Sequence, residues 1–300
     1  MALRKILPLI FSIAMLPVIA VAQPGSGMHR EGYGMVKTNI SISYGHEWGN
    51  ISDGFSARAS YELLSDRHST FTANARYTST ETDFGEGDVS GDYSPDVIGI
   101  NGIHVMGQIG MTYTYRTMLG GKPIVAMGML NGDIGAGRFQ RISGIVMGLY
   151  MLRATRTTRF GLGPLVMLNS TSKIPAFLVF MYHHRFNDRW AVNVYGGMMG
   201  FDYTPSRDDM FSLGADIDVK SFYFTPGDSR LPKHCRFTST AFRPMVKYRR
   251  RLLQNLYLDV QAGATIKMSC RVNGVNGTKE YFQCHRKAAP FVQAAMSYSL

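Results

Sequence analysis

A strict two-residue alternation over residues 54–79 constrains the fold of this chain more than any other feature. Apolar residues occupy every second position of two runs, at Phe55, Ala57, Ala59, Tyr61 and Leu63 and then at Phe71, Ala73, Ala75 and Tyr77. Polar residues lie between them, and the polar turn 65–68 separates the runs. A period of two places all the apolar side chains on one face of a strand. Each run has about ten residues, which is long for a soluble strand and long enough for a tilted strand to cross a bilayer.

The same alternation recurs along the chain to its last residue. Further runs cover residues 36–48, 103–116, 211–220, 242–248, 256–268 and 292–300. Residues 122–201 are apolar on both faces, so the strands expected there have a less certain phase. The pattern gives 13 candidate strands, whereas single-chain bacterial barrels have an even number. We therefore expect 12 strands, with 14 as the alternative, and place the ambiguity in residues 123–160 and 202–236.

The connections between the runs are of two kinds. Tight, charged links at 65–68, 119–123, 184–189 and 249–255 contrast with longer Gly/Asp/Ser-rich links, of which 80–101 is the longest. Short turns at one end and long loops at the other are typical of outer-membrane barrels. A soluble β-sandwich would also alternate, but the strand lengths and the aromatic residues near strand ends favour a membrane-spanning sheet. Such a sheet must close, because a bilayer leaves no partner for an open edge.

The predicted fold is therefore all-β, a transmembrane antiparallel up-and-down β-barrel formed by residues 36–300. After residue 22, no apolar stretch approaches the roughly 18 residues of a transmembrane helix.

The N-terminus indicates export. Arg4 and Lys5 precede the apolar run 6–21, and Ala20-Val21-Ala22 forms an A-x-A cleavage signal. This is the layout of a secretory signal peptide. We expect residues 1–22 to be that signal peptide, residues 23–35 to be a short periplasmic segment, and the mature protein to reside in the outer membrane.

The net charge of +11 falls to +9 without Arg4 and Lys5. A net positive charge is compatible with binding to nucleic acid or to anionic lipid. The export signal and the lack of a helix-turn-helix or aromatic RNA-binding motif exclude nucleic acid as an expected partner. The expected partner is outer-membrane lipid or lipopolysaccharide.

The C-terminal run carries a family resemblance. Its sequence, PFVQAAMSYSL, has alternating apolar or aromatic residues at Val292, Ala294, Met296, Tyr298 and Leu300. With the signal peptide and the amphipathic strands, it resembles the single-chain outer-membrane β-barrel proteins of Gram-negative bacteria. The resemblance covers the whole mature chain and identifies no subfamily. It implies that these five residues form the assembly signal read by the barrel-assembly machinery, with Leu300 in place of the usual terminal Phe.

If the apolar faces contact lipid, the opposite faces place a mixed set of charges in the lumen. The lumen-facing candidates are Arg58, Glu62, Arg76, Arg116, Asp216, Asp218, Lys220, Arg243, Lys247, Asp259 and Lys267. Seven are basic and four acidic. They fit a structural lattice of salt bridges that fills the lumen, and they also fit a narrow pore with a slight preference for anions. A small polar solute is the partner that such a pore would take.

Two carboxylates are candidates for catalysis. Asp216 and Asp218 lie on one face of a strand, about 7 Å apart by the strand rise, and paired carboxylates can activate water. However, the only Asp-x-His, Asp66-Arg67-His68, lies in a tight turn, and no Ser is placed by spacing against His183 or His184. We expect no catalytic residue, no metal site and no cofactor, and we interpret the acidic 80–101 connection as a solvated loop rather than a calcium site.

The three cysteines are Cys235, Cys270 and Cys284. An exported protein can form disulfides, and Cys270 and Cys284 flank a loop of 13 residues. Closing it would contribute about 3 kcal/mol in the chain-entropy model. Cys270–Cys284 is the expected pair, with Cys235 as a competitor.

The sequence leaves three functions open. The leading one is a narrow pore, transport or ligand-binding barrel. The alternative is a structural or surface-interaction barrel whose lumen is filled by side chains, and an outer-membrane hydrolase is the third.

Overall fold

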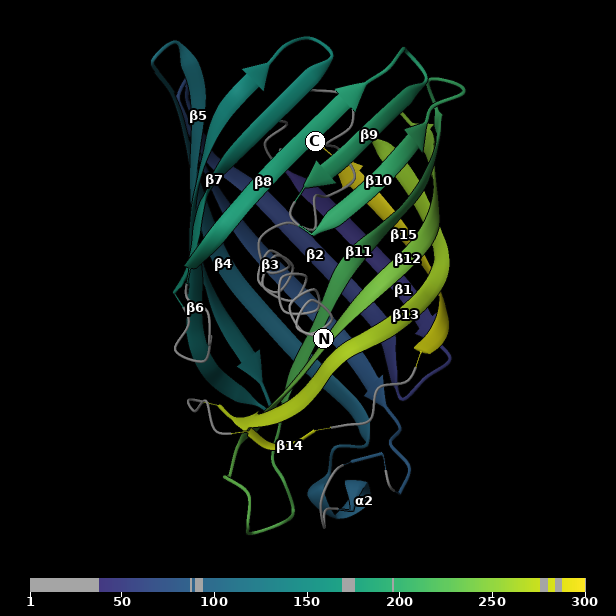
Figure 1. Cartoon of the computed structure of the whole chain (residues 1–300). Helices are drawn as coiled ribbons and strands as arrows, with labels where there is room; N and C mark the ends of the chain where they lie inside the picture. The colour runs from purple at the N-terminus through teal and green to yellow at the C-terminus, as the bar shows by residue number, and fades with distance from the viewer. Residues whose placement is uncertain are drawn as a thin grey trace, which may run out of the picture.

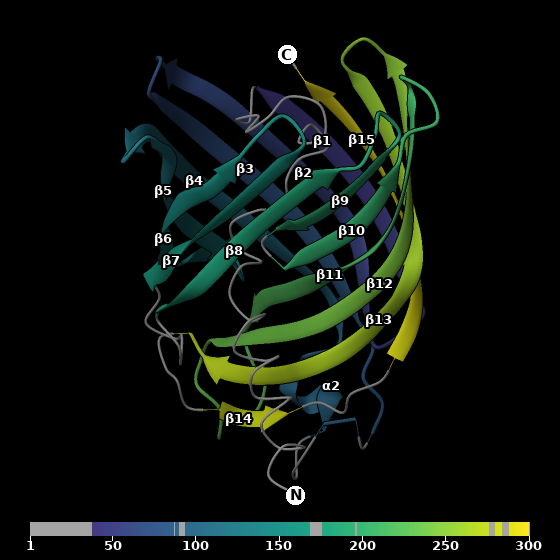
Figure 2. The ribbon, with the colours of Figure 1, turned by 45° about the horizontal axis from the view of Figure 1, so that its top comes forward.

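The computed structural model shows a closed antiparallel β-barrel (Figures 1 and 2). It describes residues 38–86, 88–89, 94–168, 176–195, 197–275, 280–283 and 288–299. The expected signal peptide and the segment 23–35 lie outside these residues. None of the described helical segments is long and apolar enough to span a bilayer.

The elements follow one another along the chain in a simple order. They are β1 (Asn39–Glu47), β2 (Ile51–Ser65), β3 (Ser69–Thr82), α2 (Pro95–Ile98), β4 (Gly102–Leu119), β5 (Lys122–Gly135), β6 (Arg138–Ala154), β7 (Thr158–Leu168), β8 (Ala176–Arg185), β9 (Trp190–Tyr195), β10 (Met198–Tyr203), β11 (Asp209–Phe224), β12 (Cys235–Leu253), β13 (Leu256–Gly274), β14 (Glu280–Gln283) and β15 (Ala288–Ser299).

Fourteen strands, β1–β13 and β15, form the ring. Each pairs with the next along the chain, β15 pairs with β13, and β1 pairs with β15 from Asn39↔Ser299 to Glu47↔Phe291. The short β14 pairs with β13 outside the ring. The expected barrel is confirmed, but the expectation of 12 strands is wrong and the alternative of 14 holds. The reason lies in β5–β7, whose inner faces carry apolar side chains, so that two-residue alternation does not mark these strands.

The alternating apolar residues point to the outer surface of the barrel, as the sequence predicts. On the β2–β3 hairpin, Phe55, Tyr61 and Tyr77 are 41%, 60% and 42% exposed on the outer surface. Ile103, Ile109 and other apolar residues of β4 continue this exposed apolar band. A wide apolar outer surface on a closed barrel is the arrangement that lipid requires. The protein is therefore a single-chain barrel of the outer membrane.

The two rims of the barrel differ. The tight turns β2–β3, β4–β5, β6–β7, β8–β9, β10–β11 and β12–β13 share one rim with the start of β1 and the end of β15. In the first of these turns, the Asp66 carboxylate accepts backbone hydrogen bonds from His68 (2.7 Å) and Ser69 (2.6 Å), which lower its pKa below the ordinary value. The longest connections leave the opposite rim, where α2 and β14 lie (Figure 1). By the usual arrangement of bacterial barrels, the short-turn rim is periplasmic and the other is extracellular.

The extracellular rim is covered by a packed apolar cap. Side chains from the β3–β4 connection and α2 meet side chains from the ends of β11, β12 and β13. The cap consists of Ile51, Phe84, Val89, Ile98, Ile100, Phe222, Phe224, Leu231, Cys235, Phe237, Cys270 and Val272, with Tyr281 packed against them. Thr82 and Asn101 fasten the β3–β4 connection through hydrogen bonds to Ile100 and Phe84. This end of the barrel is thus closed by a small core of its own.

The extracellular half of β11 leaves the outer wall and packs across the lumen. Strand β10 pairs with β11 only between Phe211 and Ala215. Beyond this point, Phe222 stacks on His104 of β4 with ring centroids 4.0 Å apart, and the Tyr223 hydroxyl donates a 2.8 Å hydrogen bond to Asp133 of β5. Side chains of β11 consequently occupy part of the lumen in its extracellular half.

Candidate functional site in the barrel lumen

The structure places the eleven predicted charged residues on the inner face of the barrel. They alternate with the outward apolar residues of β2, β3, β4, β11, β12 and β13. It brings seven of them into clusters with direct contacts or direct strand pairing, namely Asp216, Asp218, Lys220, Arg243, Lys247, Asp259 and Lys267. Glu62 and Arg116 lie nearer the periplasmic rim, apart from these clusters.

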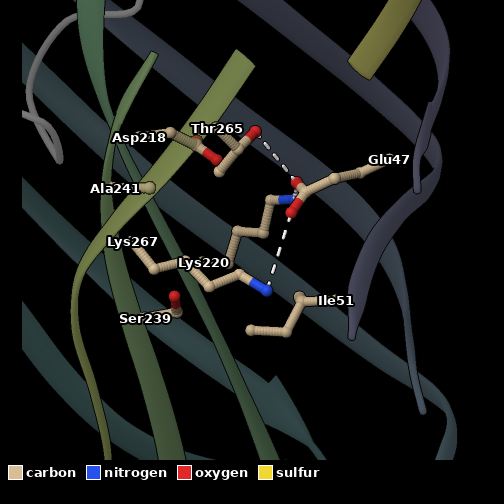
Figure 3. A pocket seen from close by; sticks show the side chains of 8 residues that line it. All are labelled: Glu47, Ile51, Asp218, Lys220, Ser239, Ala241, Thr265 and Lys267. Carbon is tan, nitrogen blue, oxygen red and sulfur yellow. Dashed lines mark hydrogen bonds and ion pairs between the residues drawn. The ribbon is translucent and has the colours of Figure 1, made fainter. Parts of the chain in front are cut away.

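The most buried cluster is centred on Glu47, at the extracellular end of β1 (Figure 3). Its carboxylate lies 2.9 Å from the Lys220 ammonium and 3.7 Å from that of Lys267, and it accepts a 3.2 Å hydrogen bond from Thr265. The side chains of Glu47, Lys220 and Lys267 are 2%, 8% and 3% exposed. The residues around this point leave no space for a water molecule between them. The cluster is therefore closely packed inside the barrel.

Arg243 continues the charged network on β12. Its guanidinium lies 3.4 Å from the Asp218 carboxylate and 3.7 Å from the centre of the Phe291 ring. Asp216 is the direct cross-strand neighbour of Arg243. The two carboxylates that were candidates for catalysis thus lie beside one buried cation.

A second network lies nearer the periplasmic rim. Asp259 of β13 accepts a 2.7 Å hydrogen bond from Arg249 and lies 3.5 Å from Lys247, both on β12. On the neighbouring strands, His183 donates a 2.5 Å hydrogen bond to Asn193, and the Asn193 amide donates to Asp202. These contacts tie β8, β9 and β10 together by side chains.

A third polar junction joins four strands at Asp133. Its carboxylate accepts hydrogen bonds from Gln108 (2.8 Å), Arg141 (3.0 Å) and Tyr223 (2.8 Å). The partners belong to β4, β6 and β11, so this junction holds the extracellular half of β11 against the opposite wall.

Part of the inner face of β5–β9 differs from the rest of the lumen because it is apolar. Here the inward residues form one cluster, while Leu130, Val146 and Leu178 of the same strands are 55%, 49% and 61% exposed on the outside. The cluster, which we call the inner apolar wall, consists of Met127, Met129, Ile145, Met147, Leu149, Leu165, Met167, Phe177, Val179 and Tyr195. The lumen thus has one apolar side and one charged side.

Sequence reasoning missed Glu47, Asp133, Arg141, Arg249 and the inner apolar wall. Glu47 is the last residue of its strand and precedes Trp48, so the sequence suggests a position at the rim of the barrel. Asp133 and Arg141 lie in the segment whose phase was uncertain. The absence of alternation over 122–201 was itself the available signal for the wall, because a strand apolar on both faces must contact something apolar on each side.

The histidines have local partners. The His104 ring donates to the Ile100 carbonyl (2.8 Å), and His184 hydrogen-bonds to Thr158 (2.8 Å). Within the described part of the chain, no group of three or more His, Cys, Asp or Glu side chains could hold a metal ion.

Two further expectations concern the cysteines and the last strand. Cys235 and Cys270 are buried free thiols in the cap, and Cys284 lies outside the described residues, so its pairing stays a prediction.

In β15, Val292, Met296 and Tyr298 point outward and are 43%, 48% and 42% exposed, and Ala294 shares their face. Leu300 lies outside the described residues, and recognition by the assembly machinery stays a prediction.

No model of a known protein family matches this sequence, and no curated protein matches it. Solved structures with a similar fold include the COG4313 outer membrane channel from Pseudomonas putida F1, with 10% identity, a TM-score of 0.43, and coverage of 89% of this chain and 97% of that one. A Pseudomonas aeruginosa FadL homologue has 9% identity, a TM-score of 0.43 and coverage of 87% and 90%. The Salmonella typhi outer membrane phospholipase dimer with bound calcium has 7% identity, a TM-score of 0.36 and coverage of 92% and 94%. At these identities and scores, the neighbours carry no information on the activity of this chain.

Proposed function

We propose that this outer-membrane barrel is a non-catalytic ligand-binding or transport barrel that accepts an elongated, partly apolar molecule in the periplasmic half of its lumen. The inner apolar wall is the observation that carries this proposal. Ten apolar or aromatic side chains from five adjacent strands gather on the side of the sheet that faces away from lipid. A water-filled pore has no need of such a surface, because barrels that conduct water carry polar side chains inside.

The composition of the wall favours a binding surface. Four of its members, Met127, Met129, Met147 and Met167, are methionines. Their flexible, polarisable side chains adapt to the shape of an apolar ligand. An amphipathic molecule fits this lumen better than the small polar solute expected from the charges alone, because the apolar wall and the charged residues of β11–β13 line different parts of the same lumen.

The packed extracellular half supports binding rather than free diffusion. The Glu47 cluster leaves no room for water, and the apolar cap closes the rim beyond it. Transport of the ligand would require movement of these groups, whereas binding from the periplasmic half would not.

The contacts of Asp216 and Asp218, the two candidate catalytic carboxylates, support the proposed lack of catalysis. Asp218 is paired with Arg243, and its neighbour Asp216 lies opposite the same arginine. Both carboxylates thus lie beside a buried structural cation.

Binding of a fluorescent amphiphile tests the proposal. The protein is reconstituted in lipid nanodiscs and titrated with 11-(dansylamino)undecanoic acid, with protein-free nanodiscs as the background. We expect saturable binding, and Met129→Gln should weaken it about tenfold, because Met129 is only partly buried in the wall and a ligand can cover it. About 1.4 kcal/mol corresponds to a tenfold change in Kd, and burial of an apolar side chain contributes about that amount or more.

Met111→Gln is the matched control. Met111 is 54% exposed on the lipid side of β4, so the same substitution there should leave probe binding unchanged. Heat-dependent migration on SDS gels checks that both variants form closed barrels. Equal binding by Met129→Gln and the native protein would contradict the proposal.

The second candidate function is a structural barrel with a filled lumen. The buried Glu47–Lys220–Lys267 cluster favours it, since such a lattice stabilises the barrel and occupies part of its lumen. A folded, membrane-inserted protein that shows no saturable probe binding would support this candidate.

A further inference from the structure

We propose that the periplasmic rim holds a binding site for an anionic phospholipid, formed by the β6–β7 and β8–β9 turns and the aromatic side chains beside them. The site lies on the outside of the barrel (top of Figure 1), so it does not depend on the ligand proposed for the lumen. Its occupant is a phospholipid of the periplasmic leaflet whose head group has a net negative charge. The head group contacts arginines of the two turns, and the acyl chains lie along the aromatic side chains.

The two turns carry an excess of positive charge. Residues 153–159 and 184–190 contain five arginines and one acidic residue, Asp188. Four of these arginines are exposed, namely Arg153, Arg156, Arg185 and Arg189. Asp188 forms an ion pair of 4.0 Å with Arg185, and among the described residues no acidic side chain forms an ion pair with the other three. This part of the rim is therefore electrostatically complementary to an anionic head group.

Basic residues in two other turns of this rim have acidic neighbours. Arg251, at the end of β12, lies 2.5 Å from Asp208, which precedes β11. In the β2–β3 turn, Arg67 directly follows Asp66. The β6–β7 and β8–β9 turns differ from these two because their arginines outnumber the acidic residues.

A backbone hydrogen bond joins the β6–β7 and β8–β9 turns. The Arg185 amide donates to the Thr157 carbonyl over 2.8 Å, and Thr157 directly follows Arg156. At the other end of the β8–β9 turn, the Thr204 amide donates a 2.8 Å hydrogen bond to the Arg189 carbonyl. The arginines of two turns are therefore held close together on a fixed backbone. A guanidinium suits the phosphate of a lipid because its planar N–H donors bind two oxygens at once.

A group of aromatic rings lies beside these arginines. Trp190 directly follows Arg189, and its ring centre lies 5.2 Å from that of Phe201 and 4.4 Å from that of Tyr203. The Phe186 ring lies 5.9 Å from the Phe201 ring. Trp190, Phe186 and Phe201 are exposed, and the direct pair of Trp190 with Tyr203 lies on the outer face of the sheet. Rings of this kind lie at the level of the lipid head groups, so the arginines next to them lie at that level too.

Quenching of Trp190 fluorescence tests the inference. The chain has two tryptophans, so Trp48→Phe leaves Trp190 as the reporter beside Arg189. The full protein is reconstituted in phosphatidylcholine vesicles that contain phosphatidylglycerol brominated on its acyl chains near the head group, and a parallel series contains phosphatidylcholine brominated in the same way. We expect the site to prefer the anionic lipid about fivefold or more, because each basic residue near a negatively charged membrane surface adds about a fivefold attraction.

Variants of the two turns test which residues bind the head group. Arg156→Gln combined with Arg189→Gln should remove most of the preference, and the corresponding double lysine variant should keep part of it. Arg67→Gln is the matched control, because it removes an exposed arginine from another turn of the same rim and should leave the preference at Trp190 unchanged. Heat-dependent migration on SDS gels checks that each variant forms a closed barrel.

Three outcomes would overturn the site. They are equal quenching by the two brominated lipids, an unchanged preference in the double glutamine variant, and a loss in Arg67→Gln as large as in that variant, which would show a diffuse effect of net charge. Inorganic phosphate, added at constant ionic strength, should not relieve the quenching by phosphatidylglycerol. Relief by phosphate would overturn the assignment to a lipid and identify a site for the free anion.

Discussion

Glu47 is the residue on which the packed half of the lumen depends. It supplies the carboxylate that two buried lysines from β11 and β13 share, and a hydroxyl from β13 completes its contacts. Charges removed from water are stable only when they are paired and hydrogen-bonded. Glu47 therefore joins the first strand of the barrel to strands that lie close to the other end of the chain.

Replacing Glu47 by Gln should destabilise the barrel strongly. The substitution keeps the shape of the side chain but leaves Lys220 and Lys267 buried without their carboxylate. Removal of one partner from a buried ion pair costs about 3–5 kcal/mol. Urea unfolding of the protein in lipid vesicles, followed by tryptophan fluorescence, measures this loss in the free energy of unfolding.

Glu62→Gln provides the matched control. Glu62 also faces the lumen, but it lies on β2 near the periplasmic rim and is only half-buried. Its replacement should change the free energy of unfolding by less than about 1 kcal/mol. Equal stability of Glu47→Gln and the native protein would show that the cluster is not a stabilising lattice.

At the scale of single elements, β11 is the strand that departs from a regular barrel. Its periplasmic half pairs with β10 and β12, whereas its extracellular half pairs with β12 and packs against the inner face of β4 and β5. The close approach is possible because Gly135 has no side chain. A Cβ atom there would lie 2.8 Å from the Tyr223 ring and 3.1 Å from the Tyr223 Cβ.

Gly135→Ala should therefore loosen β11 and the cap above it. Displacement of Tyr223 weakens its bond to Asp133, and the next residue, Phe224, pairs with Cys235 in the cap. In a background with Cys270 and Cys284 replaced by Ser, we expect Cys235 to react with a maleimide about tenfold faster in the variant. A buried thiol is labelled only when its surroundings open locally.

Gly128→Ala is the control on the same strand, because a Cβ there would meet nothing within 4 Å. It should leave the labelling rate unchanged. Unchanged labelling in Gly135→Ala as well would show that contact with Tyr223 does not hold the cap closed.

How well the sequence predicts each element depends on whether its two faces differ. Strands β2, β3, β4 and β15 have lipid on one side and polar groups on the other, so their alternation identifies them directly. Strands β5–β8 have lipid outside and the inner apolar wall inside, so nothing in their sequence distinguishes the faces. This is why the strand count was uncertain and why Asp133 and Arg141 were not recognised as site residues.

The clusters could not be predicted for a different reason. Alternation assigns a residue to the inner face, and it correctly directs Lys220, Arg243 and Lys267 toward the lumen. It does not identify the residue that each of these side chains contacts. For example, the distance between Glu47 and Lys220 depends on the closure of the ring and on the inward path of β11. Neither the closure of the ring nor the inward path of β11 can be deduced from the sequence of a single strand.

For the whole molecule, the two halves of the lumen differ in the residues that line them. The extracellular half contains the Glu47 cluster and the apolar cap, whereas the inner apolar wall belongs to strands whose pairing is concentrated toward the periplasmic rim. A barrel of this design should not conduct ions steadily, although it has enough strands to enclose a pore.

Planar-bilayer recordings test this closure. The inserted native protein should give no steady current above the lipid background, because buried charged side chains and apolar cap residues fill one half of the axis. A variant with Ile98→Asp and Ile100→Asp, two fully buried cap residues, places unpaired charges in the apolar core, and the high cost of burying them should force the cap open. We expect this variant to show current bursts, which also proves insertion. A steady, reproducible current from the native protein would contradict a filled lumen and favour an open pore.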